Sequence, residues 1–433
     1  MTASTTPSLV EIQRLQFGDR AKAEAQLLAF LAPDIPGLER VVINTKPESL
    51  NSINGFLTIE GREHFFKTHT EEHETEGKSP DARELYNTEL LRAAGYPVVV
   101  PGLVRTVPGK QIAIYEKVEF PTLFDVAKKE EDLLLRGGSL SPAAAALVDA
   151  QRRLDAKILE IYRRTLALPA RSTVDAPIHQ LFSERLRAGR RVDDFYRGKA
   201  VHLPGAQVPF DRLATLQWTI NGVSYGETIE QLIALARRVL DPARPTATVC
   251  GHGDAHNGNV WVEDGGKQLF YFDAAFAGHH DPLLDAVKPL FHNVFARWMY
   301  FPSEAAGEFE IEYAISSARI DVRHTFRPSS LRRAFFDSKV DEVLAPTVKA
   351  LSHDGVLPSD WRDMLRAALF CCPFLTVNLA AAPNPTGKLD ERYEPAIRLL
   401  GLCLAIEIGS TARSDGASEI RPYIARLAEI AAR

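Results

Sequence analysis

The chain has 433 residues, of which 45% are hydrophobic and 25% charged, and its 51 basic and 56 acidic side chains give a net charge of -5. This length and composition are typical of a globular protein with two or three folded units and a large core, and they argue against disorder. The balanced charge provides no basic field for a polyanion, which argues against nucleic acid as the principal partner.

Cysteine use and hydropathy indicate a cytoplasmic protein. The four cysteines include no C-x-x-C pair, so we expect buried free thiols in a reducing compartment. The first twenty residues lack the basic start and apolar core of a secretory signal. The longest uncharged run, residues 367–387, is interrupted by prolines, and its apolar part is shorter than the roughly 20 residues of a membrane span.

Residues 40 to about 118 change their residue pattern several times, as short strands around one helix would. The segments "RVVINTK", "NGFLTIE", "REHFFKTHT" and "KQIAIYEKV" are short and rich in β-branched and aromatic residues. Between the third and fourth of them, the pattern predicts a helix that begins near Pro80 and is closed by Gly95 and Pro97. We therefore expect a β-rich unit with one main helix over residues 1–118.

After residue 118 the pattern changes to long helices. The best start signal is at Ser141 and Pro142, which suit the N-cap and first turn of a helix. Further helices are expected at residues 177–196, 227–240, 328–351, 360–379 and 393–410. Residues 198–226 are rich in turns and receive no assignment. The predicted plan is a mostly helical unit over residues 119–433, with residues 250–285 embedded in it.

The stretch "GHGDAHNGNVWVEDGGKQLFYFDAAFAGHHDP", residues 251–282, carries the candidate chemistry. Asp254 lies in a loop, Asn259 precedes a first strand and Asp273 ends a second, with the turn "DGG" between the strands. Because a hairpin brings its two ends together, Asn259 and Asp273 are expected to present oxygens to the same Mg²⁺. Phosphoryl transfer to an alcohol needs such metal ligands and a carboxylate near the hydroxyl, which Asp254 would supply.

The segments "HGDAHNGN", "FYFD" and "GHHDPLLDAV" together resemble the catalytic segment of aminoglycoside phosphotransferases and choline kinases. The resemblance implies an α+β, two-lobed protein-kinase-like fold, with a small β-rich N-lobe and a large helical C-lobe. It implies Asp254 as catalytic base and Asn259 and Asp273 as Mg²⁺ ligands. It also implies that His252 holds the loop and that Asp285 is a second, structural acid.

Such a fold also needs a strand lysine followed by a helix glutamate in the N-lobe. Lys67 lies in "HFFKTHT" and Glu84 in "ARELYNTELL", with Glu89 as a competing partner for the lysine. The resemblance implies that Lys67 contacts the α and β phosphates and that Glu84 positions it. In "IAIYEKVEF", which resembles the linker between lobes, Lys117 and Val118 would offer backbone groups to adenine.

Two segments depart from the family. The expected phosphate loop is usually rich in glycine, whereas "ESLNSINGF" has only Gly55, so the predicted phosphate contacts fall on Ser52, Asn54 and Gly55. After Asp273, where an aromatic and an acidic residue are common, this chain has two alanines, which leaves fewer groups to shape the metal site.

Two other functions compete with this interpretation. A zinc-type metallohydrolase would draw its ligands and its catalytic acid from the imidazole-rich segment, namely His252, Asp254, His256, His279, His280 and Asp281. That interpretation leaves Asn259, Asp273 and Lys67 without a shared purpose, and we expect the remaining histidines to hydrogen-bond within loops. The other competitor is a kinase-like binding protein without activity, which only the atypical phosphate loop favours.

The sequence thus predicts an ATP-dependent phosphotransferase, with GTP as the alternative donor and Mg²⁺ as cofactor. Its partner would be a small molecule with a hydroxyl group, such as an aminoglycoside, an amino alcohol, a sugar or a related metabolite. The acidic segment "EFEIEY", residues 308–313, would attract a cationic acceptor, but such a segment is more often a solvated helix face. The sequence predicts neither the acceptor nor the oligomeric state.

Overall fold

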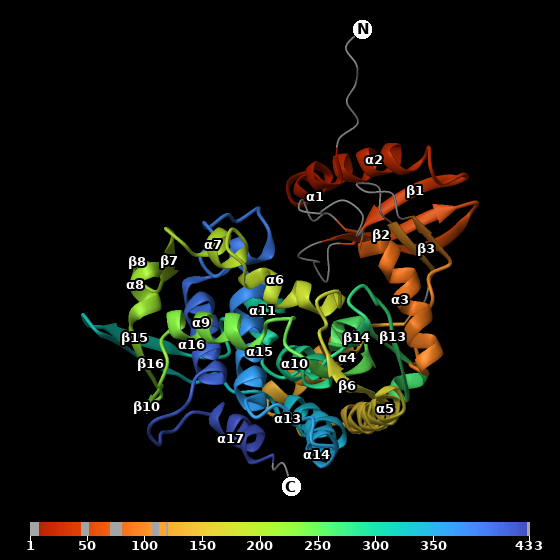
Figure 1. Ribbon diagram of the computed structural model, residues 1–433. Coiled ribbons are helices and arrows are strands. Elements are labelled where there is room, and N and C mark those ends of the chain that lie inside the picture. The colour runs from red at the N-terminus through yellow and green to blue at the C-terminus, as the bar shows by residue number, and fades with distance from the viewer. Residues whose placement is uncertain (1–7, 45–51, 70–79, 106–111, 118–119, 431–433) are drawn as a thin grey trace.

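The computed structural model describes residues 8–44, 52–69, 80–105, 112–117 and 120–430, and these form two lobes (Figure 1). The smaller lobe contains the N-terminal sheet and the larger lobe is mostly helical, as in protein kinases. The fold therefore agrees with the predicted α+β architecture. The boundary predicted at residue 118 lies outside the described residues.

The smaller lobe is built on a five-stranded antiparallel sheet with the order β1-β2-β3-β5-β4. Its strands are β1 (Leu38–Ile43), β2 (Ser52–Ile59), β3 (Arg62–His69), β4 (Leu103–Arg105) and β5 (Ile112–Glu116). Helix α3 (Pro80–Ala94) follows β3 and ends at Gly95, whose φ of 89° is the left-handed conformation expected of a glycine that closes a helix. Helix α3 and four of the strands lie where the sequence pattern placed them, whereas β4 was not predicted.

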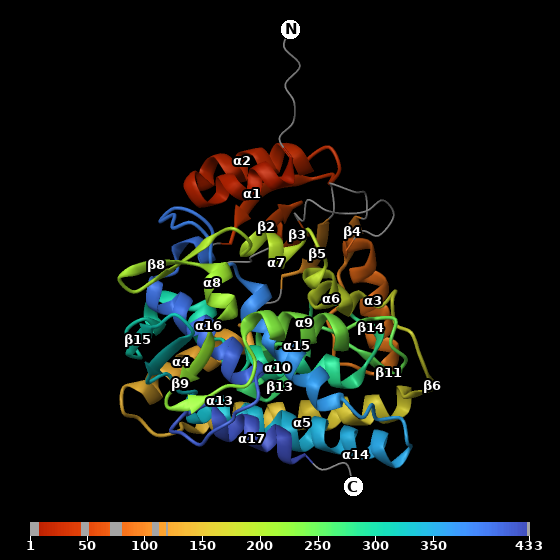
Figure 2. The same cartoon turned by 60° about the vertical axis from the view of Figure 1, so that its left-hand side comes forward.

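Two helices that the sequence pattern did not indicate cover this sheet, α1 (Leu9–Gly18) and α2 (Arg20–Leu31) (Figure 2). Helix α1 begins with a capping box, because Ser8 and Glu11 exchange side-chain and backbone hydrogen bonds. Apolar side chains from the two helices and the sheet form one buried cluster, which includes Ile12, Leu27, Ile53 and Phe66. The helices therefore close the outer face of the sheet.

Most of the longer helices of the larger lobe begin near the predicted positions, whereas α4 and α17 were not predicted. Ser141 Oγ accepts a hydrogen bond from the backbone of Ala144 and caps the longest helix, α5. The longer helices are α4 (Leu123–Leu135), α5 (Pro142–Thr165), α9 (Ile229–Val239), α10 (Pro282–His292), α13 (Ser330–Ser338), α14 (Ala345–His353), α15 (Trp361–Thr376), α16 (Pro395–Gly409) and α17 (Arg421–Glu429). The segment predicted at residues 328–351 is α13 and α14 joined by the π-helical turn Lys339–Leu344. None of the helices within the described ranges is long and apolar enough to cross a membrane.

Shorter elements fill the segments where the sequence was ambiguous. The helix predicted at residues 177–196 is broken into the 3-10 turn Pro177–Leu181 and the short helices α6 (Ser183–Leu186) and α7 (Arg191–Phe195). The unassigned residues 198–226 hold β7 (Ala200–Leu203), β8 (Ala206–Pro209), α8 (Phe210–Thr215), β9 (Gln217–Ile220) and β10 (Val223–Ser224). The other short helices are α11 (Arg297–Tyr300) and α12 (Pro302–Ala305), and 3-10 turns occupy Asp264–Gly266 and Leu389–Arg392.

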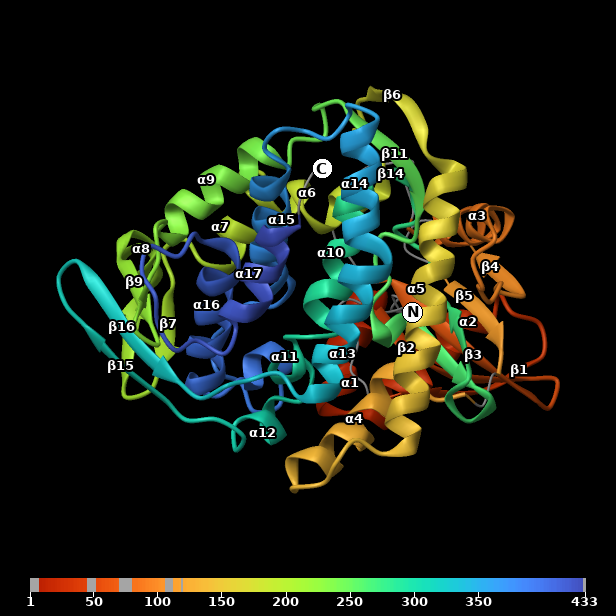
Figure 3. The same ribbon diagram turned by 90° about the horizontal axis from the view of Figure 1, so that it is seen from below.

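The acidic segment at residues 308–313 is not part of a helix, although its composition is typical of a solvated helix face. It leads into β15 (Ile311–Ile315), which pairs with β16 (Arg319–His324). These strands extend a sheet with β9 and β10 at the edge of the larger lobe farthest from the N-terminal sheet (Figure 3). Along β15 the half-buried Ile311, Tyr313 and Ile315 alternate with the exposed Glu312 and Ala314, which is a strand pattern with a period of two.

A hairpin joins the two lobes. Strands β12 (Val260–Glu263) and β13 (Gln268–Tyr271) pair antiparallel, and each outer edge meets a segment near the lobe boundary. Tyr271 exchanges backbone hydrogen bonds with Pro97 and Val99, and Val262 donates to the carbonyl of Pro121. Trp261 also contacts the rings of two sheet residues, Phe65 and Tyr115, edge to face. The ends of this hairpin are therefore held at the interface between the lobes.

Candidate active site

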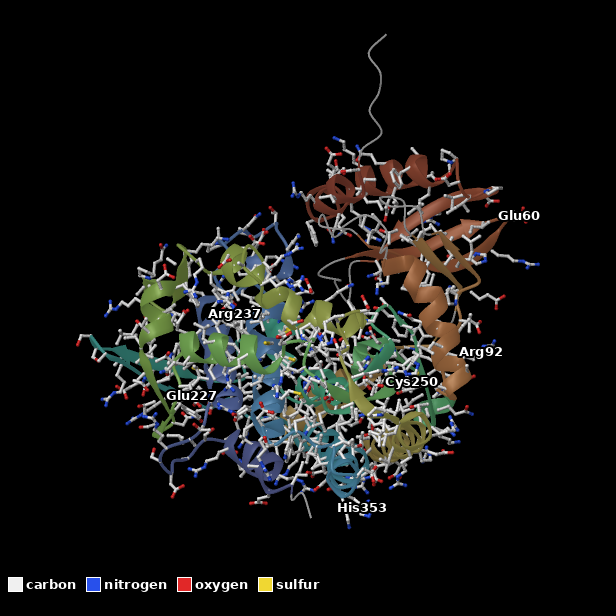
Figure 4. The ribbon with its side chains drawn as sticks, in the orientation of Figure 1. Glu60, Arg92, Glu227, Arg237, Cys250 and His353 are labelled. Carbon is white, nitrogen blue, oxygen red and sulfur yellow. The ribbon has the colours of Figure 1, made fainter. Side chains whose placement is uncertain are left out.

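The candidate catalytic loop begins where β11 (Thr246–Gly251) ends. This strand pairs with β14 (Gly278–His280) on one side and with β6 (Ala167–Arg171) on the other. Cys250, labelled in Figure 4, lies just below the sheet lobe, and its carbonyl accepts a hydrogen bond of 3.0 Å from Tyr96 at the end of α3. Gly253 has a φ of 81°, and a side chain there would collide with the carbonyl of Phe276. The loop can therefore turn sharply only because this residue is glycine.

Asp285 supports the loop from beneath. Its carboxylate accepts hydrogen bonds from the backbone of Gly253 at 2.6 Å, from Nε2 of His280 at 2.9 Å and from the hydroxyl of Tyr162. The side chain is buried, and it lies in the first turn of α10, whose N-cap is Asp281. The structure thus places Asp285 at the base of the loop, where the sequence predicted a structural acid.

His252 connects the loop to the end of the hairpin. Its ring is buried, Nε2 donates to the carbonyl of Phe272 at 3.0 Å, and Nδ1 lies 3.4 Å from the backbone nitrogen of Asp254. Burial lowers the pKa of His252, so the ring is neutral at physiological pH. A neutral imidazole with this tautomer suits the loop-holding role predicted for this residue.

Asp254, Asn259 and Asp273 converge as their spacing predicted. The amide nitrogen of Asn259 donates to the carbonyl of Asp254 at 2.9 Å, which turns its amide oxygen away from that bond. The carbonyl of Asn259 accepts from the backbone of Phe272 at 3.1 Å, directly before Asp273. Asp273 has a φ of 59°, which is uncommon for a residue other than glycine. This bend turns the chain sharply at the position where a carboxylate would face a metal.

The donor set fits Mg²⁺ better than Zn²⁺. Asn259 and Asp273 bring an amide oxygen and a carboxylate, which are hard ligands of the kind that magnesium prefers. Within the described ranges there is no group of three or more His, Cys, Asp or Glu side chains placed to hold a metal. His252 and His280 instead form hydrogen bonds with the carbonyl of Phe272 and the carboxylate of Asp285. The geometry therefore does not favour the zinc-type alternative.

Lys67 reaches the site from the other lobe. It lies on β3, and its Nζ forms an ion pair with Oδ2 of Asp273, in which both side chains are mostly buried. Glu84 lies on α3, but its side chain is outside the described residues, so its pairing with Lys67 stays a prediction. Asn87, on the same helix, donates to the carbonyl of Ala275 at 3.2 Å. Helix α3 thus contacts the chain just beyond Asp273 through a residue that sequence reasoning missed.

The predicted phosphate and adenine contacts are only partly described. Ser52, Asn54 and Gly55 belong to strand β2, and a side chain at Gly55 would collide with the carbonyl of Val42 on β1. Close approach of two strands therefore explains this glycine, and its phosphate contact stays a prediction, as do those of the other two residues. Lys117 pairs with Glu63 at 2.7 Å, whereas Val118 lies outside the described residues.

Two basic side chains from the larger lobe face Asp254. Lys288 Nζ lies 3.6 Å from Asp254 Oδ1, and His256 Nε2 lies 3.7 Å from Oδ2. Burial acts to raise the pKa of Asp254, but the charge of Lys288 and the nearby ring of His256 hold it below the ordinary value. The carboxylate is therefore ionised at neutral pH. Sequence reasoning missed Lys288, although a lysine in the apolar stretch "DPLLDAVKPLFH" is an unusual feature that would have indicated it.

The fold and the site define a two-lobed, protein-kinase-like chain with an acidic loop and hairpin between the lobes. No known sequence family and no curated protein matches it. Among solved structures, a spectinomycin phosphotransferase in complex with ADP and spectinomycin is 12% identical and aligns over 89% of this chain and 97% of its own, with a TM-score of 0.38.

Two further structures are similar to the chain. A type I macrolide 2'-phosphotransferase is 15% identical, with coverage of 79% of this chain and 94% of its own and a TM-score of 0.33. An ethanolamine kinase of Plasmodium vivax is 11% identical, with coverage of 91% and 82% and the same TM-score. At these identities the likeness concerns the fold, so the roles of individual residues rest on the geometry of this chain.

Proposed function

We propose that the chain is an ATP-dependent phosphotransferase that phosphorylates a hydroxyl group of a small molecule, with GTP as the alternative donor. One observation carries the proposal. Three oxygen-bearing side chains, Asp254, Asn259 and Asp273, gather at one loop and hairpin, and Lys67 approaches them from the other lobe. Phosphoryl transfer requires this set of a base, metal ligands and a cation.

Each side chain has a distinct role in the proposed reaction. Asp254 is ionised, and it accepts the proton of the acceptor hydroxyl as that oxygen attacks the γ-phosphate. Asn259 and Asp273 hold Mg²⁺, which supplies neutralisation of the phosphate oxygens when bound. Lys67 is placed to contact the donor phosphates, and Gly253, fixed by Asp285, sets the height of the loop.

Asp254→Asn tests the proposal most directly. A positioned base contributes roughly 10² to 10⁴ in rate, so turnover should fall by about that factor while the rise in melting temperature with nucleotide and Mg²⁺ stays nearly unchanged. Phosphate transfer to a panel of hydroxylated compounds and thermal unfolding provide the two measurements. Asp321→Asn, whose side chain is partly exposed on β16, is the matched control and should be fully active.

The outcomes separate the three candidate functions. Equal turnover in Asp254→Asn and the parent chain would refute Asp254 as the base. Nucleotide binding without transfer to any compound would indicate a kinase-like binding protein. Zinc bound to the purified protein, together with no effect of nucleotide or Mg²⁺ on the melting temperature, would favour the metallohydrolase.

A further inference from the structure

Lys288 is a buried lysine that has no role in the proposed reaction as described by Asp254, Asn259, Asp273 and Lys67. It lies in the middle of α10, where every residue of the helix is buried, and its own exposed fraction is 4%. Burying an ammonium group costs free energy unless hydrogen bonds and opposite charge compensate it. The partners of Lys288 therefore indicate what the group is for.

One partner of Lys288 is the ring of His292, one turn further along α10. Lys288 Nζ lies 3.1 Å from Nε2 of His292, and the hydroxyl of Tyr300 lies 2.8 Å from Nδ1 of the same ring. Because an ammonium group only donates, Nε2 must accept, so Nδ1 carries the ring proton and donates to Tyr300. Burial and the charge of Lys288 lower the pKa of His292 well below its ordinary value, which keeps the ring neutral.

The other partner is the candidate base, and the contact is incomplete. The 3.6 Å between Lys288 Nζ and Asp254 Oδ1 is longer than a hydrogen bond, and Oδ1 has no hydrogen-bond partner among the described residues. Within the same ranges, the only hydrogen bond of the Lys288 ammonium group is the one to His292. Two N–H groups and one carboxylate oxygen thus remain for a molecule bound between them.

This arrangement matches an acceptor with two neighbouring oxygens. The reacting hydroxyl donates its proton to Asp254, and an oxygen on the adjacent carbon accepts a hydrogen bond from Lys288. An ammonium group on that adjacent carbon would instead meet Lys288 as a like charge, which is strongly unfavourable in a buried site. Lys288 therefore disfavours an amine on the carbon adjacent to the reacting hydroxyl, where it favours an oxygen.

The surrounding described groups offer little negative charge to offset this repulsion. Asp273, whose charge acts on Asp254 and His256, is paired with Lys67. His256 and His292 are neutral because burial lowers their pKa values, and burial raises the pKa of the neighbouring Cys372 thiol to about 12. The positive charge of Arg185 also acts on His292. In the part of the chain that the structure describes, Asp254 is the only carboxylate in ion-pair contact with Lys288.

Acidic side chains farther away are already paired with arginine. Arg297 contacts Glu131, Asp132 and Glu308, and Arg332 contacts Glu131 as well. Strand β15, which carries Glu312, lies at the far edge of the larger lobe (Figure 3). The acidic segment weighed from the sequence as an attraction for cations is thus either neutralised or distant.

We propose that Lys288 selects the acceptor, so that the substrate carries a vicinal oxygen beside the reacting hydroxyl, as in a vicinal diol or a 2-hydroxy acid. Amino alcohols and aminoglycosides with an ammonium group at that position are excluded. The inference rests on the proposed function and names the substrate class of the same site. Lys288 would touch the acceptor, and His292 and Tyr300 would position Lys288.

Matched compounds that differ by one group provide the test. Glycerol and serinol, glycerate and serine, and glucose and glucosamine each differ by a hydroxyl replaced with an amine. With ATP and Mg²⁺, the parent chain should favour the oxygen member by about 100-fold in kcat/KM, because a site built for a hydroxyl rejects its replacement strongly. Binding is followed in parallel by melting temperature with ADP and Mg²⁺ present, which requires no turnover.

Substitutions at Lys288 then identify the residue responsible. Lys288→Met removes the charge at similar length and should reduce the preference at least tenfold, while Lys288→Arg should retain it. Nucleotide-dependent stabilisation should be unchanged in both variants, because Lys67 and Asp273 are retained. His292→Phe, which removes the group behind Lys288, should weaken the preference through KM, and Lys349→Met on α14 is the control lysine.

Each result decides the inference. Preference for the amine members, equal use of both members, an unchanged ratio in Lys288→Met, or nucleotide binding with no oxygen member bound or turned over would overturn it. The last of these outcomes, and preference for amines, would leave nucleotide binding intact. Failure of the proposed function gives other results: ADP and Mg²⁺ would not shift the melting temperature, or they would shift it without phosphate transfer to any compound, oxygen or amine member alike.

Discussion

Asp285 shows how one buried carboxylate can organise a catalytic loop. It accepts hydrogen bonds from a backbone group of the loop, from His280 on β14 and from Tyr162 on α5, and thereby joins three segments distant in sequence. Removal of a buried hydrogen-bonded charge leaves its donors without a partner, which is more costly than loss of the bonds alone. We therefore expect this residue to control stability as well as loop position.

The pKa of Asp285 leads to a prediction about acid stability. Burial acts to raise this pKa, but His280, Tyr162 and the backbone of Gly253 together lower it from 3.8 to about 2. A lowered pKa stabilises the folded state above the unfolded value near 3.8, and the stabilisation is lost as the pH falls towards 2. Linkage gives about 2 kcal/mol at neutral pH.

Urea unfolding of the parent chain and of Asp285→Asn at several pH values measures this contribution. The parent should be the more stable at neutral pH, and the gap should narrow by about 1 kcal/mol between about pH 6 and about pH 3. Other carboxylates titrate in both proteins and cancel in the difference. A gap that does not change with pH would show that the charge of Asp285 is not what stabilises the fold.

Local spacing predicted the residues of the loop and hairpin, but not those that meet across the fold. Asp254, Asn259 and Asp273 lie within twenty residues, and turn and strand signals between them were enough to bring them together. Lys288 meets Asp254 only because α10 packs beneath the loop. No periodic pattern encodes the distance between a helix face and a loop, so only the structure could supply this contact.

At the scale of elements, α10 carries most of the support for the site. Asp285, Lys288 and His292 repeat along one helix at intervals of three and four residues, which places them on one face. The N-cap is Asp281, whose Oδ1 accepts from the backbone of Leu283 at 2.8 Å and of Leu284 at 3.3 Å. The register of the helix therefore sets the height of all three side chains.

Asp281→Ala should loosen this helix. It removes the carboxylate that accepts from both backbone N–H groups and leaves the hydroxyl of Thr246 without its partner, so the free energy of unfolding should fall by about 1 to 2 kcal/mol. Asp281→Asn keeps an amide oxygen for the same donors and should lose much less. Denaturant unfolding of the two variants provides the comparison, and equal losses would show that capping is not the role of Asp281.

Explicit start and stop signals located several helix ends, although the capping box of α1 was missed. Helix α5 begins at Ser141 as expected, and α3 ends at Gly95. Residues 177–196 lack side-chain caps in the structure and break into short pieces, since they are held by packing in a large buried cluster rather than by local preference. Strands β9 and β16 pair in parallel across a hundred residues, and a local pattern cannot indicate such pairing.

At the scale of the whole molecule, the lobes meet where the proposed chemistry takes place. The hairpin of β12 and β13 is bonded along both edges by segments near the lobe boundary, and Lys67 on β3 pairs with Asp273 at the end of the hairpin. A nucleotide bound between the lobes would contact both sides of this interface. We therefore expect ligand binding to stabilise the whole chain in one transition rather than one lobe alone.

Removal of the metal distinguishes the roles of Asp273 and Lys67, the two residues of this interlobe ion pair. ADP with Mg²⁺ at a hundred times its Kd should stabilise the parent chain by about 2.7 kcal/mol, followed as a rise in melting temperature. Asp273→Asn, which tolerates the left-handed backbone better than alanine, should lose most of this rise, and EDTA should reduce the parent to the same level. Lys67→Met should bind the nucleotide more weakly both with and without metal, because its charge acts on the phosphates directly. If EDTA weakens nucleotide binding to Asp273→Asn as much as to the parent, then Asp273 does not hold the metal.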